Sequence, residues 1–416
     1  MVLPTSRTLW FFFSLLLIAL PRVLSAWQDQ QTEMPAIQVG SEEELSRAVR
    51  AAKPGTTIRI APGTYRGGFE FRQLQGAANQ PIILAAADKT KPPIFKGGNS
   101  CFHLYDPAFV ELHDLILEDA RANGINIDDA GSLDSPAHHV VLRGLTIRGV
   151  GPEGNRDGIK LSGVDDFRVE GCTIERWGNG GSAIDMVGCH QGEIRECTFR
   201  HRGDIAANGV QTKGGSSGIV IQRCRFENAG GRAVNIGGST GTNYFRPLNT
   251  SYEAKDITVE DCTFIGSQAP ICFVGVDGAV VRYNTIYRPT RYILRILQES
   301  RGDSFVPCRN GLFTNNVIAF RSDEVSSGVN IGPGTDPQSF TFEQNHWYCI
   351  DRPESSNRLS LPVKESAAVY GIEPQFQDAE KGDLQLQATS QVRNAGVRKP
   401  MIRESTKEQK DEKKKD

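Results

Sequence analysis

A series of polar residues at equivalent places in the chain could bind or transform a ligand. Short segments of the form apolar-x-apolar recur between residues 124 and 236, and their middle positions hold Asn126, Lys160, Asp185, Gln211 and Asn235. Alternate residues of a strand point to opposite faces, so we expect these five side chains to share one outward face. A column of mixed charges and amides predicts a shallow groove that suits an extended polymer.

Further charged side chains accompany this column. They are Asp157, Lys213 and Arg232 beside it, and His201 and Arg202 at a neighbouring corner. Two carboxylates such as Asp157 and Asp185 could divide the acid and base roles of a glycoside hydrolase. The alternative is a solvated strand face with ordinary cross-strand pairs, such as Lys160 with Asp185. We interpret the cluster as a functional groove.

A loose repeat positions these segments. Large apolar residues recur at spacings of 22 to 38 residues: Leu117, Ile147, Ile174, Phe199, Phe226, Phe264, Ile286, Ile318 and Trp347. Each repeat carries two strand-like pieces, exemplified by Phe167-Arg-Val-Glu and Gly158-Ile-Lys-Leu. Very short strands and Gly/Asn-rich corners are typical of a parallel β-helix, whose stacked coils complete one another's hydrogen bonds. The sequence therefore predicts an all-β fold, a single-stranded right-handed parallel β-helix of about ten coils.

The cysteines follow the same repeat. Cys172, Cys197, Cys224 and Cys262 each lie two residues before a large apolar residue, and Asn284, Asn316 and Asn345 occupy this position in later repeats. Disulfides are one interpretation of nine cysteines, but the odd number leaves at least one unpaired. We instead expect buried free thiols that continue as a ladder of inward asparagines.

The two ends of the repeat have their own signals. Residues 41–52 combine a capping box, Ser41 with Glu44, with apolar residues at 45, 48, 49 and 52. We expect this amphipathic helix to cover the first coil of a β-helix domain spanning residues 37–398. Residues 399–416 form a charged tail that we expect to be disordered.

The first 26 residues have the pattern of a signal peptide. Arg7 supplies the positive charge, Leu9 to Leu20 the apolar run, and Leu24-Ser25-Ala26 the cleavage site. An uncleaved anchor is the alternative, but the run is short for a bilayer. We therefore expect an exported, soluble protein, either secreted or periplasmic, with no membrane contact after cleavage.

The overall charge excludes some partners. The chain has 47 basic and 49 acidic residues, so it has no net field that would recruit nucleic acid. We expect a monomer.

The N-terminal motifs resemble a known family. Between Ile37 and Phe264 the chain is similar to the chondroitinase B and alginate lyase type of polysaccharide lyases, which share a pectate-lyase-like β-helix. The motifs are Lys53-Pro-Gly, Ala61-Pro-Gly-Thr-Tyr, Gln80-Pro-Ile-Ile-Leu and Pro93-Ile-Phe-Lys-Gly-Gly. The resemblance implies cleavage of a uronate-containing polysaccharide by β-elimination, with calcium neutralising the uronate carboxylate.

The family's functional positions map onto the segment Ala207-Asn-Gly-Val-Gln-Thr-Lys213. Lys213 takes the position of the catalytic base, and the acidic metal-ligand position falls on Asn208. The position of the assisting arginine falls on Gly237, so Arg232 is the nearest basic group. The resemblance thus implies Lys213 and Arg232 as catalytic residues and Asp185 with Asn208 as calcium ligands. Lys160, Asp157, Asp185, Gln211, Asn235, His201 and Arg202 would bind substrate.

Two other functions remain open from the sequence. Asn155-Arg-Asp157 is similar to a polygalacturonase motif, although Gly181-Ser182 stands where that group has an acidic pair. A non-catalytic carbohydrate-binding β-helix would use the same groove without needing Lys213. The sequence does not identify the polymer.

Overall fold

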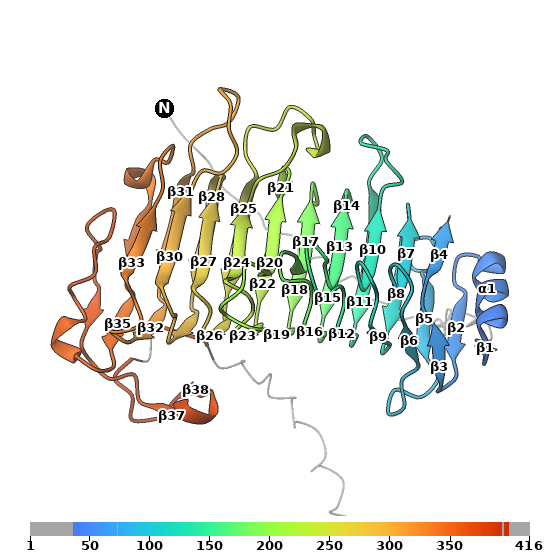
Figure 1. Ribbon diagram of the computed structural model, residues 1–416, viewed down its shortest axis with the longest axis horizontal. Helices are drawn as coiled ribbons and strands as arrows, with labels where there is room; N and C mark the ends of the chain where they lie inside the picture. The colour runs from blue at the N-terminus through green and yellow to red at the C-terminus, as the bar shows by residue number, and fades with distance from the viewer. Residues whose placement is uncertain (1–35, 73, 393–394, 399–416) are drawn as a thin grey trace, which may run out of the picture. The chain divides into compact units, whose positions relative to one another are not determined.

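The computed structural model describes residues 36–72, 74–392 and 395–398. The expected signal peptide and the expected charged tail lie outside these residues. Within the described part, three long parallel sheets stack coil upon coil, as Figure 1 shows. This arrangement is a parallel β-helix, so the predicted fold class is confirmed. No helix in the described ranges is long and apolar enough to cross a membrane.

The ten-stranded sheet contains the predicted apolar-x-apolar segments. In spatial order its strands are β33 (Ser327–Ile331), β30 (Tyr292–Leu297), β27 (Ala269–Val274), β24 (Arg232–Gly237), β20 (Asn208–Lys213), β17 (Ser182–Val187), β13 (Ile159–Ser162), β10 (Ile125–Asp128), β7 (Phe102–Tyr105) and β4 (Phe69–Arg72). Ten strands in this sheet agree with the expected number of coils.

The twelve-stranded sheet contains the large apolar residues of the repeat. Its strands are β3 (Thr64–Arg66), β6 (Ile94–Lys96), β9 (Ile116–Glu118), β12 (Thr146–Arg148), β16 (Thr173–Glu175), β19 (Thr198–Arg200), β23 (Arg225–Glu227), β26 (Thr263–Ile265), β29 (Thr285–Tyr287), β32 (Val317–Phe320), β35 (His346–Cys349) and β36 (Val369–Tyr370). The nine aligned residues from Leu117 to Trp347 pair in register from coil to coil. Phe226 stacks on Phe199 and Phe264, with ring centroids 4.8 and 4.7 Å apart.

The fourteen-stranded sheet contains the other predicted pieces, such as Arg168–Glu170. Its strands are β1 (Ile37–Val39), β2 (Thr57–Ile60), β5 (Ile82–Ala86), β8 (Ala108–His113), β11 (Ala137–Arg143), β15 (Arg168–Glu170), β18 (Glu193–Arg195), β22 (Val220–Gln222), β25 (Ala254–Glu260), β28 (Val276–Arg282), β31 (Arg309–Thr314) and β34 (Thr341–Glu343), with β14 (Val164–Asp165) and β21 (Ser216–Ser217) beside this path. A coil therefore has three strands rather than the predicted two pieces. The difference arises because a bend residue with positive φ separates the anchor residue from the strand before it, as at Gly171 with φ of 60° and Glu196 with φ of 55°.

The cysteine prediction is confirmed. All nine cysteines are buried free thiols. The column continues as an asparagine ladder, in which Asn284 Nδ2 donates to Asn316 Oδ1 over 3.0 Å and Asn316 Nδ2 donates to Asn345 Oδ1 over 2.9 Å. Each asparagine also bonds to backbone of an adjacent coil, so these buried amides are satisfied.

Helix α1 (Glu42–Ala51) lies at the β1 end of the coils (Figure 1). Ser41 Oγ accepts a hydrogen bond from Glu44 N, and Leu45, Ala48 and Val49 are buried. The antiparallel pair β37 (Phe376–Asp378) and β38 (Asp383–Leu386) lies against the side of the twelve-stranded sheet, where Arg225 Nη2 donates to Gly382 O. Helix α1 is thus present at the position where the first coil needs a cover, as the sequence predicts.

Candidate active site

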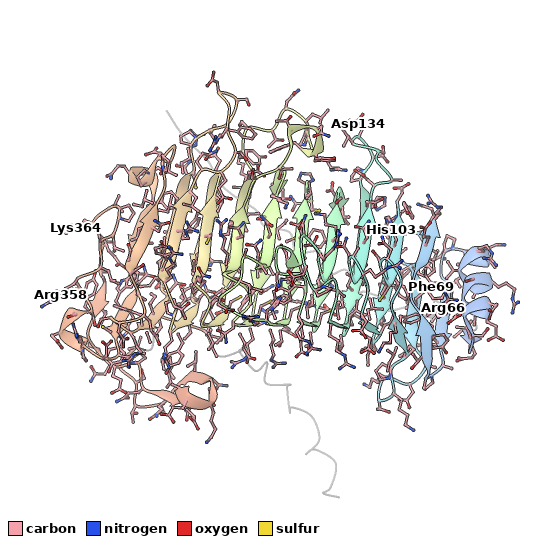
Figure 2. All side chains as sticks on the ribbon, viewed as in Figure 1. Arg66, Phe69, His103, Asp134, Arg358 and Lys364 are labelled. Atoms are coloured by element: carbon pink, nitrogen blue, oxygen red, sulfur yellow. The ribbon has the colours of Figure 1, made fainter. Side chains whose placement is uncertain are left out.

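The ten-stranded sheet presents one column of outward side chains. Register aligns its members in successive coils: Glu70, His103, Asn126, Lys160, Asp185, Gln211, Asn235, Cys272, Arg295 and Asn330. The five residues that the sequence pattern groups together are thus neighbours in adjacent coils. Figure 2 labels His103, which lies toward the α1 end of this column.

A cavity of about 590 Å³ opens over β20, β24 and β30. Its lining includes four cationic side chains, Lys213, Arg232, Arg291 and Arg295, but only two acidic ones, Asp204 and Glu299. Amide side chains, including those of Asn208, Gln211 and Asn235, line the rest of its polar wall. Four cations against two acids favour an anionic ligand.

A buried cluster of charges supports one side of this cavity. Asp185 is fully buried and forms ion pairs with Lys160 and with Lys213, whose Nζ lies 3.2 Å from Asp185 Oδ1. Burial alone would raise the pKa of Asp185, but the two ammonium groups outweigh burial and lower it. The pKa of Lys160 is raised, because Asp185 and Asp157 outweigh the opposing effect of burial. Asp185 is therefore an anion that orients two lysines.

Asp157 has the opposite character. Burial, together with the negative charge of Asp185, raises the pKa of the Asp157 carboxyl to about 7. Its Oδ1 accepts a hydrogen bond of 2.8 Å from the backbone N–H of Ser182. Neither Asp157 nor Asp185 lines the cavity, and each has at most 2% of its surface exposed. The two carboxylates therefore lie beneath the groove, out of reach of a glycosidic oxygen.

Amides connect the residues of the cavity wall. Gln211 Oε1 accepts hydrogen bonds from Ser182 Oγ, Asn208 Nδ2 and Lys213 Nζ, over 3.3, 3.2 and 3.5 Å. This network, together with Asp185, fixes the direction of the Lys213 side chain.

Arg232 approaches from the next coil. Its Nη2 lies 2.7 Å from Glu299 Oε1, and its Nη1 donates to Asn235 Oδ1 over 3.3 Å. Arg232 and Lys213 therefore reach one cavity from adjacent strands.

Gly237 occupies the position at which the family resemblance implies an arginine. The register of β20 and β24 places Gly237 next to Lys213 in the following coil. Its φ is +93°, and a Cβ atom at this position would lie 1.8 Å from the carbonyl oxygen of Val274. No side chain fits there, so a basic group must come from another position.

Two predicted substrate-binding residues lie elsewhere. His201 packs edge-on against Trp177, and its Nε2 lies 2.7 Å from the carbonyl oxygen of Trp177. Arg202 points into solvent and pairs with Asp204. Neither residue lines the cavity. Arg202 nevertheless contacts the cavity wall indirectly, because its partner Asp204 is one of the lining residues.

The predicted calcium ligands do not fit calcium. Calcium takes six to eight oxygen ligands, whereas both oxygens of Asp185 face ammonium groups and Asn208 Nδ2 donates to Gln211. In the described ranges, no three His, Cys, Asp or Glu residues form a group that could hold a metal. Two lysines occupy the position next to Asp185 where a cation would bind.

The sequence interpretation missed the part of the cavity formed by β30. Leu294-Arg295-Ile296 has the same apolar-x-apolar form as the other segments, so the repeat could have identified Arg295. Arg291, Tyr292 and Glu299 flank that segment, and they line the cavity. Sequence carried no signal for the pairing of Glu299 with Arg232, which are 67 residues apart.

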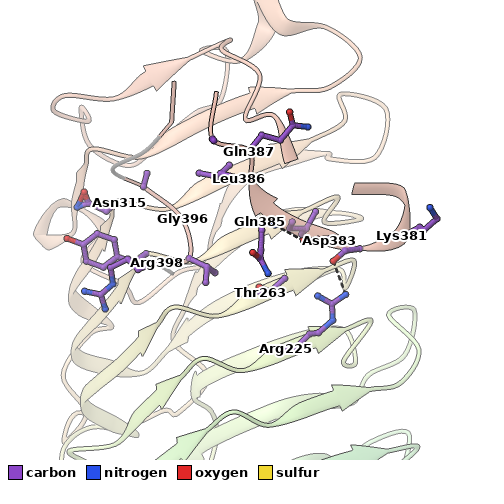
Figure 3. A pocket seen from close by; sticks show the side chains of 16 residues that line it. Arg225, Thr263, Asn315, Lys381, Asp383, Gln385, Leu386, Gln387, Gly396 and Arg398 are labelled. Carbon is purple, nitrogen blue, oxygen red and sulfur yellow. Dashed lines mark hydrogen bonds between the residues drawn. The ribbon is translucent and has the colours of Figure 1, made fainter. Parts of the chain in front are cut away.

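A larger cavity of about 1140 Å³ lies between the C-terminal segment and the twelve-stranded sheet (Figure 3). Arg225 and Thr263 of that sheet form one side, and residues 381–388 and 395–398 form the other. None of the ten outward residues that align along the ten-stranded sheet lines this larger cavity.

Comparisons with known proteins concern the fold. Residues 100–247 match the family model of the right-handed β-helix region. No curated protein matches the chain. Pectate lyase Pel9A is 15% identical, with 86% of this chain and 87% of that chain covered and a TM-score of 0.50.

Two other solved structures are also similar. An alginate lyase from Paenibacillus sp. str. FPU-7 is 17% identical, covering 72% of this chain and 96% of that chain, with a TM-score of 0.46. The A-module of the Azotobacter vinelandii mannuronan C-5 epimerase AlgE4 is 13% identical, covering 81% and 94%, with a TM-score of 0.48. The family match and the pectate lyase likeness agree with the three stacked sheets, and the protein has the fold of a right-handed parallel β-helix.

Proposed function

We propose that this protein is a polysaccharide lyase that cleaves an acidic, uronate-containing polysaccharide by β-elimination. The observation that carries this proposal is the position of Lys213 and Arg232 on adjacent strands of one predominantly cationic cavity. A β-helix groove suits an extended polymer because equivalent side chains repeat along it. The resemblance of the N-terminal motifs to polysaccharide lyases supports the same reaction.

The reaction needs a base and a cation. Lys213 is an ammonium in its ion pair with Asp185, so Nζ first releases a proton to solvent. The neutral Nζ then accepts the proton from C5 of the uronate, and the electron pair of that C–H bond becomes the C4–C5 double bond. The C4–O bond breaks, and the leaving oxygen takes a proton from solvent. Arg232 binds the uronate carboxylate and stabilises the charge that develops on it.

In this proposal, cationic side chains neutralise the uronate carboxylate. Calcium has that role in the lyase family that the sequence resembles. Arg232 supplies a planar donor pair that matches a carboxylate, and it holds the carboxylate of Glu299 in this structure. A substrate carboxylate would replace Glu299. Asp185 acts as a positioning residue, because it holds Lys213 and Lys160 from below the groove.

The burial of both aspartates argues against the hydrolase. A glycosidase acid must reach the glycosidic oxygen, but Asp157 and Asp185 do not line the cavity. Lys160, Gln211 and Asn235 remain proposed substrate-binding or supporting residues, while His201 and Arg202 do not.

We also propose that the protein is exported, as a monomer, to the periplasm or the exterior. The sequence of residues 1–26 supports export. Burial of all nine thiols suits an oxidising compartment, since buried thiols do not form disulfides with other molecules.

The test is a panel of acidic polysaccharides incubated with the full chain, followed by ultraviolet absorbance and mass spectrometry of the products. The lyase predicts products with a conjugated double bond at the new non-reducing end. Saturated products would contradict the lyase and favour the hydrolase. Binding without cleavage of any polymer would favour the non-catalytic carbohydrate-binding protein.

A further inference from the structure

A fully buried carboxylate outside the cavity connects three segments that line it. Glu253 directly precedes β25, has no exposed surface and does not itself line the cavity. We propose that Glu253 is a positioning residue that fixes Lys213 and Arg232 relative to each other. Its effect on turnover rests on the proposed function, whereas the contacts that it makes do not.

The carboxylate of Glu253 accepts four hydrogen bonds. Its Oε2 accepts from the backbone N–H of Gly214 and from Thr240 Oγ1, each over 2.8 Å. Its Oε1 accepts from the backbone N–H of Thr240 over 2.8 Å and from Ser300 Oγ. Among the described residues, Glu253 forms no ion pair. A buried carboxylate is costly unless hydrogen bonds satisfy it, so these four donors hold it in place.

Each donor stands next to a residue of the cavity wall. The residue directly before each donor lines the cavity: Lys213 before Gly214, Ser239 before Thr240, and Glu299 before Ser300. Glu299 in turn holds Arg232, whose Nη2 lies 2.7 Å from Glu299 Oε1. One carboxylate therefore connects the end of the strand that carries Lys213 with the partner of Arg232.

The pattern of donors suits a carboxylate rather than an amide. The two backbone N–H groups are fixed donors, and each meets a different oxygen of Glu253. In a Glu253→Gln variant the amide nitrogen would replace one of these oxygens. It would then face the N–H of Gly214 in one orientation and the N–H of Thr240 in the other, so no orientation of the amide keeps both contacts.

Close packing restrains the same side chain. A Cβ atom at Gly237 would lie 3.3 Å from Glu253 Cβ, and one at Gly275 would lie 3.1 Å from Glu253 Cγ. Backbone therefore approaches the side chain closely at both glycines, which leaves the carboxylate little freedom to move. A group held by packing and by four hydrogen bonds can transmit a fixed geometry to the residues beside its donors.

A second carboxylate, in the last coils, provides a matched control. Glu365 also accepts four hydrogen bonds, two from Asn345, one from Trp347 and one from Tyr370. None of these residues lines the cavity over β20, β24 and β30. A Glu365→Gln variant therefore disturbs a comparable network away from Lys213.

The experiment compares the full chain as wild type, Glu253→Gln and Glu365→Gln. Hydrogen–deuterium exchange is measured by mass spectrometry, without polymer, for peptides covering residues 208–216, 238–244 and 296–303. The kcat and KM values are measured from absorbance of the double bond, on a polymer that the wild type cleaves. Ser300→Ala removes one donor and keeps the carboxylate, so it replaces Glu253→Gln if that variant does not fold.

We expect Glu253→Gln to exchange faster than the wild type in all three peptides. Its kcat should fall about tenfold, with a smaller change in KM, because misplaced groups slow the chemical step more than they weaken binding. Ser300→Ala should exchange faster in the peptide of residues 296–303 and lose less kcat. Glu365→Gln should match the wild type in these peptides and in kcat.

The outcomes separate this inference from the proposed function. Unchanged exchange in Glu253→Gln, or wild-type kcat despite faster exchange, would overturn the positioning role and leave the lyase intact. An equal loss of kcat in Glu365→Gln would also overturn it, because the effect would then be one of general stability. Faster exchange in Glu253→Gln, with no double bond formed by the wild type on any polymer, would overturn the lyase and leave the connection between the three segments.

Discussion

The outer faces of the β-helix differ in how they pair their charges. On the fourteen-stranded sheet, Glu170 bridges Arg143 and Arg195 of the two adjacent coils at the protein surface. On the ten-stranded sheet, the bridging carboxylate is Asp185, which is fully buried between Lys160 and Lys213. Surface ladders add little stability because water screens them. A buried bridge holds its partners firmly, and here those partners face a cavity.

The largest effect should follow from removing the buried bridge. In an Asp185→Ala variant, Lys160 and Lys213 would lose their shared anion while partly buried, which destabilises a protein by about 3–5 kcal/mol. Urea unfolding followed by circular dichroism measures this loss.

The matched control is Asp323→Ala, which removes an exposed carboxylate that pairs with Arg321. Its unfolding midpoint should not change measurably, because exposed ion pairs contribute little. If both variants lost equal stability, the distinction between the buried and the surface pairs would be wrong.

The asparagine ladder, in later coils, allows a test of the buried interior of the β-helix. An Asn316→Ala variant would leave the backbone N–H of Asn284 and the carbonyl of Val281 without their side-chain partner. An unsatisfied buried group costs about 1–3 kcal/mol, so the variant should unfold at lower urea concentration. An unchanged midpoint would mean that water replaces the amide and that the ladder contributes nothing.

A further effect concerns pH and Asp157. The folded protein raises the pKa of this carboxyl from 3.8 to about 7, so the folded state binds its proton more tightly than the unfolded state does. The resulting stabilisation is complete below pH 3.8 and is lost as the pH rises to about 7.

An Asp157→Asn variant should therefore have a flatter dependence of unfolding free energy on pH between 4 and 7 than the wild type. The difference in slope is at most about 1.4 kcal/mol per pH unit. Parallel curves for the two proteins would show that Asp157 does not titrate in this range.

The sequence predicted the architecture because each coil repeats the same constraints. Period-two alternation determines which side chains point outward, and stacking then brings Lys160, Asp185 and Gln211 into neighbouring coils. The aligned cysteines and asparagines follow from the same logic. The third strand of each coil was missed because a single bend residue divides what reads as one segment.

The site was harder to predict because it depends on side-chain geometry. The polar column has a gap at Cys272, which hid its continuation at Arg295. Whether a corner residue faces the groove depends on local packing, so His201 could not be placed before its contact with Trp177 was known. The sequence analysis offered the pair of Lys160 with Asp185 as an alternative, and the structure contains it. The second pair, of Asp185 with Lys213, was not foreseen, although it helps to decide whether calcium fits.

The most direct test of the proposed function compares Lys213→Ala with Lys381→Ala, an exposed lysine on another part of the surface. Both variants are assayed for formation of the double bond and for polymer binding, on a substrate that the wild type cleaves. The account predicts that Lys213→Ala loses activity by about 10²-fold or more while still binding polymer, because loss of a catalytic base affects the chemical step. Lys381→Ala should match the wild type. Undiminished formation of the double bond by Lys213→Ala would contradict the assignment of Lys213 as the base.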